Sequence, residues 1–203
     1  MIIEDNIKNL VDIGTPSYIF DLNILNDNIR CMRENIQRDT SICYAMKANP
    51  FVVKYISDKV DRLEVCSPGE YEICIRENIE PDKIVVSGVN KTKESIDRII
   101  EYSKGKGIYT IESKNHYEIL SKCASDKKYK IEVIIRLTSC NQFGVDKVLF
   151  EELVEKIVKD DNLELLGLHY YSGTQKKISK IQKEIKELDE YAGYIKDKYG
   201  LEY

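Results

Sequence analysis

A repeated order of short apolar strands and helical segments constrains the fold of this 203-residue chain more than any other feature of its sequence. From residue 41 onward, six segments of this kind each precede a helical pattern, at residues 41–46, 63–66, 83–87, 107–111, 131–137 and 163–171. Such short strands are typical of a parallel sheet whose two faces are both buried. The alternation therefore predicts an α/β protein with an all-parallel sheet.

Two architectures fit this pattern, an open doubly wound sheet and a (β/α)8 barrel of the TIM type. The chain has no Gly-x-Gly-x-x-Gly loop, which would favour the first. Eight barrel units usually need about 250 residues, so the six units here predict an incomplete ring. Residues 18–21 are interpreted as a short strand before a helix at residues 22–37, and residues 200–203 as the start of a seventh strand. We expect one domain, residues 1–203.

The composition excludes several classes of function. A hydrophobic content of 42% with 33% charged residues is that of a soluble globular protein. The formal net charge of −4 gives no basic field for nucleic acid, and no apolar run is long enough to span a membrane. The N-terminus lacks a signal peptide and the six cysteines form no Cys-x-x-Cys pair. We therefore expect a cytoplasmic protein with reduced thiols and no metal site.

Lys47 stands at the end of the first of the six strands, shortly before Asn49 and Pro50. Burying an ammonium at that point costs free energy, so the presence of a lysine there requires an explanation. One explanation is a catalytic role, because a desolvated lysine has a lowered pKa and can form a Schiff base with an aldehyde. The alternative is a lysine that emerges into solvent where the strand ends. Strand-end lysines are common, and this stretch alone favours the alternative.

Polar residues gather at the carboxyl ends of the predicted strands, where the catalytic groups of barrels lie. Reading these ends in order gives Lys47, Glu64 with Ser67–Glu70, Ser87 with Gly88, Arg136, and His169 through Gln175. A lysine, two carboxylates, an arginine and a histidine are thus expected on one face. Their shared position is what predicts a site.

Four motifs occur in an order and spacing that resemble a known family. They are Tyr44-Ala-Met-Lys-Ala-Asn49, Glu64-Val-Cys-Ser-Pro-Gly-Glu70, Arg136 with Gln142-Phe-Gly-Val145, and Gly167-Leu-His-Tyr-Tyr-Ser-Gly-Thr-Gln175. Together they resemble the fold-type III pyridoxal-phosphate enzymes, the group of diaminopimelate, ornithine and arginine decarboxylases. Residues 15–21 are similar to the opening segment of that family. The resemblance covers nearly the whole chain and implies the alanine racemase-like kind of (β/α)8 barrel.

The resemblance implies pyridoxal 5'-phosphate as cofactor and a PLP-dependent amino-acid decarboxylase as the activity. Lys47 would be the catalytic residue, which holds the cofactor as an internal aldimine and later returns a proton to the product. The cofactor-binding residues implied by the motifs are Lys47, Glu64, Glu70, Arg136, His169, Tyr171, Gly173 and Thr174. Gly173 and Thr174 match a loop that cradles the cofactor phosphate with backbone N–H groups and a hydroxyl.

Alternatives stay open for three of these residues. Glu70 is either a cofactor-site residue or a solvated glutamate at a helix start, and Arg136 either lines the site or forms a structural ion pair. His169 is either a cofactor contact or a packed barrel histidine.

Two positions depart from the classical decarboxylases. Tyr171 stands where they carry a histidine that stacks on the cofactor ring, and Glu64 stands where many members have aspartate. Both departures resemble a divergent branch that includes decarboxylases of carrier-tethered or modified amino acids. We therefore expect an amino acid or an amino-acid derivative as substrate. Cys140 follows the wrong strand to be the family's catalytic cysteine and is interpreted as a buried or loop thiol.

The family continues beyond the matched motifs with a glycine-rich phosphate loop, an acidic partner of the pyridine nitrogen and a C-terminal β-domain. The chain is accordingly interpreted as a truncated N-terminal portion without the β-domain. The alternatives are an amino-acid racemase of the same fold, a non-catalytic PLP-binding or partner protein, and a self-contained single-domain barrel. Because an incomplete barrel leaves strand edges and apolar side chains uncovered, we expect a homo-oligomer, such as a homodimer.

Overall fold

The structure, a computed structural model, describes residue 14 and residues 16–201. The chain divides into two units, residues 1–40 and residues 41–203. The described part of the first unit contains helix α2 (Leu22–Asn35). The Asp21 carboxylate caps this helix by accepting hydrogen bonds from the N–H groups of Asn23 (2.7 Å) and Ile24 (3.3 Å). The strand predicted at residues 18–21 is wrong, because Asp21 serves the helix and no described segment of this unit pairs with it.

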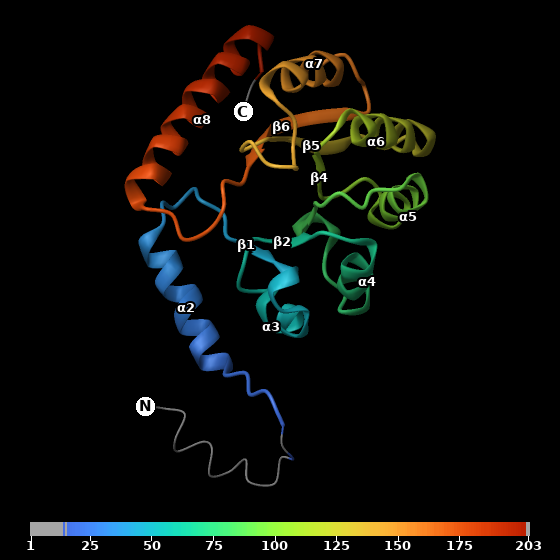
Figure 1. The fold of residues 1–203 in the computed structure, drawn as a ribbon. Coiled ribbons are helices and arrows are strands. Elements are labelled where there is room, and N and C mark those ends of the chain that lie inside the picture. Colours follow the sequence, from blue (N-terminus) through green and yellow to red (C-terminus); the bar gives the residue numbers. More distant parts are fainter. Residues whose placement is uncertain (1–13, 15, 202–203) are drawn as a thin grey trace. The chain divides into compact units, whose positions relative to one another are not determined.

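The second unit is built on a six-stranded parallel sheet (Figure 1). Its strands follow the order of the sequence, β1 (Cys43–Ala45), β2 (Arg62–Val65), β3 (Ile84–Val86), β4 (Ile108–Ile111), β5 (Ile131–Leu137) and β6 (Leu163–Tyr170). Within the described residues β1 and β6 do not pair with each other, so the ring of strands is open. The predicted incomplete (β/α)8 barrel with six units is confirmed.

Helices follow the strands and lie on the outer side of the sheet (Figure 1). They are α3 (Val53–Ile56), α4 (Pro68–Arg76), α5 (Lys93–Ser103), α6 (Lys114–Lys127), α7 (Lys147–Ile157) and α8 (Ile178–Tyr199), with 3-10 turns at Met46–Ala48, Pro50–Val52 and Pro81–Lys83. Four helices begin at a capping side chain that accepts a backbone hydrogen bond, namely Ser67, Thr92, Ser113 and Asp146. These caps fix the point at which the chain turns away from each strand end.

The core lies between the sheet and these helices. Leu63, Ile84, Ile111, Leu120, Ile135 and Leu153 are all fully buried. Each such side chain stabilises the fold by about 1.5–3 kcal/mol relative to exposure. The first strand is shorter than predicted, because buried Met46 already begins a 3-10 turn. That turn, and not a strand, carries Lys47. No helix among the described residues is long and apolar enough to cross a membrane.

Candidate active site

A cavity of about 600 Å³ opens at the carboxyl ends of the strands. Its walls come from all six strands and the segments after them, through Ala45, Lys47, Glu64, Cys66, Ser87, Gly88, Val89, Glu112, Arg136, Asn141, Phe143, His169 and Tyr171. This is the edge at which parallel α/β proteins bind their ligands. Five of the predicted site residues meet here, namely Lys47, Glu64, Arg136, His169 and Tyr171.

Lys47 reaches the cavity from the 3-10 turn after β1. Its Nζ lies 3.5 Å from a carboxylate oxygen of Glu64 and 3.9 Å from Sγ of Cys66. Partial burial acts to lower the pKa of Lys47, but the charges of Glu64 and Cys66 outweigh it and the pKa is raised. Of the two interpretations of Lys47, the lysine that emerges into solvent at the strand end therefore fits this geometry, and a lowered pKa does not. The turn leaves the side chain 62% exposed beside a carboxylate instead of inside the sheet.

The backbone at Cys66, whose side chain lies next to Lys47, is held by a hydrogen bond on one side and closely approached by Gly88 on the other. The Cys66 N–H donates to a carboxylate oxygen of Glu70 at 2.7 Å. On the other side, Gly88 has a φ of +78°, and a Cβ there would lie 2.4 Å from the Cys66 carbonyl oxygen. Glu70 thus holds the wall of the cavity from behind and is not itself one of the residues that line it. Burial, followed by the charge of Glu64, raises the pKa of the Cys66 thiol, so this thiol is protonated at neutral pH.

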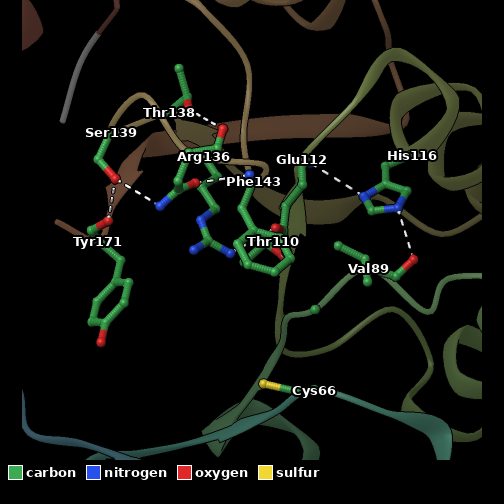
Figure 2. Close-up of polar contacts among 12 residues, drawn as sticks. Cys66, Val89, Thr110, Glu112, His116, Arg136, Thr138, Ser139, Phe143 and Tyr171 are labelled. Atoms are coloured by element: carbon green, nitrogen blue, oxygen red, sulfur yellow. Dashed lines mark hydrogen bonds and ion pairs between the residues drawn. The ribbon is translucent and has the colours of Figure 1, made fainter. Parts of the chain in front are cut away.

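Arg136 and Glu112 form an ion pair at the back of the cavity. Nη1 of Arg136 lies 2.7 Å from Oε2 of Glu112, and the two side chains are 12% and 2% exposed. The Phe143 ring covers the guanidinium at 5.0 Å from its carbon to the ring centroid. Figure 2 shows Arg136, Tyr171 and Cys66 around one open space. Both interpretations of Arg136 therefore hold, since it forms a structural ion pair and also lines the cavity.

His169 lies on β6 in register with Arg136 on β5. Its buried Nδ1 has no hydrogen-bond partner within the part of the chain that the structure describes. Burial, followed by the positive charge of Arg136, lowers the pKa of His169, so the imidazole is neutral at pH 7. A buried ring nitrogen without a protein partner is suited to a polar atom of a ligand or to water.

The loop after β5 holds the end of β6 in place. Ser139 Oγ donates to the Tyr171 carbonyl at 2.9 Å (Figure 2). The same Oγ accepts a hydrogen bond from Asn141 Nδ2 at 2.9 Å. The Tyr171 side chain itself is about half exposed at the mouth of the cavity. An aromatic ring in that position can stack on a planar ligand.

Gly173 and Thr174 are not among the residues that line the cavity. They are exposed in the loop between β6 and α8. A Cβ at Gly173 would meet only the end of the Lys176 side chain, at 4.0 Å. The phosphate cradle expected at these two residues stays a prediction.

The sequence analysis missed several residues of this site. Glu112 directly follows the strand predicted at residues 107–111, so the rule applied to the other strand ends would have found it. Cys66 stood inside a recognised motif, but nothing in the pattern assigned it a role. Buried Lys91, whose Nζ lies 3.9 Å from Glu112, carries no sequence signal.

The comparison with protein families shows which family the chain belongs to. The family described as "Pyridoxal-dependent decarboxylase, pyridoxal binding domain" matches residues 22–203. The chain belongs to this family. Membership confirms the resemblance of the sequence motifs and implies pyridoxal 5'-phosphate as cofactor. The residues fit that group, because an open cavity holds a lysine, an arginine and a histidine whose buried nitrogen has no hydrogen-bond partner among the described residues.

Relatives of this pyridoxal-binding domain are diaminopimelate decarboxylases. That of Aquifex aeolicus is 27% identical over 179 residues, which cover 80% of this chain and 42% of the relative. That of Bacteroides thetaiotaomicron is 24% identical over 180 residues, which cover 79% of this chain and 46% of the relative. The chain thus spans less than half the length of these relatives.

Solved structures show the same fold. The structure of AQ1208 from Aquifex aeolicus has a TM-score of 0.83 at 26% identity and covers 95% of this chain and 48% of that one. A diaminopimelate decarboxylase from Helicobacter pylori complexed with L-lysine has a TM-score of 0.83 at 20% identity, and the match covers 94% of this chain and 52% of that one. The pyridoxal-binding domain therefore corresponds to about half of these proteins.

Proposed function

We propose that this chain is the cofactor-binding part of a PLP-dependent enzyme that decarboxylates an amino acid or an amino-acid derivative. Lys47 is the residue that bonds covalently to the cofactor aldehyde. The observation that carries the proposal is the Lys47 amine, which lies 3.5 Å from a carboxylate oxygen of Glu64 in an open cavity that Arg136 also lines. When bound, the pyridine ring of the cofactor supplies an electron sink for cleavage at the substrate α-carbon.

The residues around Lys47 have complementary tasks. The amine must lose a proton before it attacks an aldehyde, and Glu64 is the carboxylate beside it. Arg136 offers a fixed positive charge to an anionic group. Neutral His169 offers a ring nitrogen, and the Tyr171 ring offers an aromatic face. In its protonated form Lys47 would also be able to return a proton to the product.

Decarboxylation is favoured over racemisation by the relatives, which are named diaminopimelate decarboxylases. Because the chain spans less than half of their length, the activity is proposed for the protein with the remaining part supplied. A cytoplasmic location, a homo-oligomeric state and a carrier-tethered substrate complete the proposal. The free state of all six cysteines supports the first. The strand edges of the open sheet support the second.

Borohydride trapping tests the role of Lys47. The 203-residue chain is mixed with pyridoxal phosphate, reduced, digested and mapped by mass spectrometry. We expect a phosphopyridoxyl group on Lys47 that is absent from Lys47→Ala and retained in Lys54→Ala, which alters an exposed lysine of α3. Labels spread over surface lysines with Lys47 unmodified would refute the proposal.

A further inference from the structure

A second lysine lies behind the cavity. Lys91 directly precedes Thr92, the cap of α5, and its side chain is 2% exposed. Its Nζ donates to the Gly88 carbonyl and, at 3.1 Å, to Thr110 Oγ1. The same Nζ lies 3.9 Å from Oε1 of Glu112. A buried ammonium is tolerated only when such polar atoms compensate for the lost water. Lys91 is not one of the residues that line the cavity.

These contacts connect Lys91 to two walls of the cavity. The first wall is the Ser87–Val89 loop, which Lys91 holds through the Gly88 carbonyl. The second wall is the Glu112–Arg136 pair, in which Lys91 lies near one oxygen of Glu112 while Arg136 binds the other at 2.7 Å. A carboxylate with partners at both oxygens is restrained from rotating. Lys91, together with the Thr110 hydroxyl that donates to the same Glu112 oxygen at 3.5 Å, therefore helps to hold Glu112 and, through it, the Arg136 guanidinium.

The charges of the three side chains alternate in a row. Lys91 and Arg136 are positive and Glu112 between them is negative, so the row carries one net positive charge. Burial lowers the pKa of Lys91 to about 8 against the opposing effect of Glu112, which leaves the ammonium protonated at pH 7. Cys66 and Glu64 on the β2 side and His116 from α6 are the other titratable groups near it. A neutral residue at position 91 would leave Glu112 and Arg136 as a neutral pair.

We propose that Lys91 is a positioning residue of this cavity. It orients Arg136 through Glu112 and fixes the Ser87–Val89 loop through Gly88, so that an anionic ligand meets a rigid wall with a net positive charge. The inference rests on the proposed function only for the identity of that ligand, pyridoxal phosphate.

The test compares Lys91→Met, Glu112→Gln and the double variant with the wild-type chain. Lys83→Met is the matched control, because Lys83 is a half-buried lysine that donates to the Ser57 carbonyl at 2.7 Å near the start of β3. The first readout is the pyridoxal phosphate concentration that half-saturates borohydride trapping at Lys47. The second is amide hydrogen exchange of the ligand-free chain at residues 64–67 and 86–89.

We expect Lys91→Met to raise the half-saturating concentration roughly tenfold, because a displaced Arg136 loses about one charge-assisted hydrogen bond to the anionic ligand. It should also accelerate exchange of the Ser87 amide, which donates to the Val65 carbonyl at 2.7 Å. In the Glu112→Gln background the same substitution should raise the half-saturating concentration by a smaller factor than in the wild type, because the route through Glu112 is already lost and only the contact with Gly88 remains. Lys83→Met should leave both readouts unchanged.

The proposal is overturned if folded Lys91→Met loses only resistance to urea while trapping and exchange match the wild type. If the wild-type chain is not trapped at Lys47, the proposed function fails, and unchanged exchange at residues 86–89 then refutes the role of Lys91 separately. If Lys91→Met does not fold, Lys91→Gln, which keeps a hydrogen-bond donor, is measured in the same way.

Discussion

Replacing Gly88 by alanine is expected to destabilise the chain by about 2–5 kcal/mol. The backbone at Gly88 has a φ of +78°, a left-handed conformation that costs an alanine about 1–2 kcal/mol. The new Cβ would also lie 2.4 Å from the Cys66 carbonyl oxygen and 3.0 Å from the Cys66 Cα. Both are backbone atoms, so strand β2 or the loop after β3 must move, at about 1–3 kcal/mol for overpacking.

Urea unfolding followed by far-ultraviolet circular dichroism measures this change. Gly193→Ala in α8 is the matched control, because a Cβ there meets nothing within 4 Å. In a helix interior that substitution should stabilise the chain by about 0.5–1 kcal/mol. A Gly88→Ala variant within about 0.5 kcal/mol of the wild type would refute the close approach of the two loops.

Three further outcomes are expected. The pKa of Lys91 is about 8 in the folded chain, whereas an ordinary lysine, as in the unfolded chain, has a pKa of 10.5. Between pH 8 and pH 10.5 the Lys91 amine is therefore protonated in the unfolded chain and largely neutral in the folded one. The stability of the wild type relative to Lys91→Met should therefore rise from pH 8 to pH 10.5 in urea titrations, and a falling difference would contradict the burial of Lys91. Ser139→Ala should cost about 1 kcal/mol by removing the hydrogen bond to the Tyr171 carbonyl; an unchanged urea midpoint would argue against that contact. Lys122→Ala removes an exposed pair with Asp126 at 2.9 Å and should change stability by less than about 0.5 kcal/mol; a larger loss would show that this surface pair is stronger than its exposure implies.

Much of the architecture was predictable because it follows from local pattern. Helix α8 was predicted at residues 179–198 and spans Ile178–Tyr199, and the strand predicted at residues 131–137 is β5. Apolar periodicity and capping residues act within one or two turns, so they can be read from neighbouring residues. The same local pattern failed at residues 18–21, where a short apolar run resembled a strand and Asp21 instead caps a helix.

The candidate site divides in the same way. Parallel strands end at one edge, so the sequence by itself determined that Lys47, Glu64, Arg136, His169 and Tyr171 would share a cavity. Only the tertiary structure decided the ionisation of Lys47, which depends on a carboxylate from the next strand at 3.5 Å. It also placed Lys91 behind Glu112, across 21 residues of sequence. Burial and charge pairing are properties of the distances between side chains of different strands, and no local pattern encodes those distances.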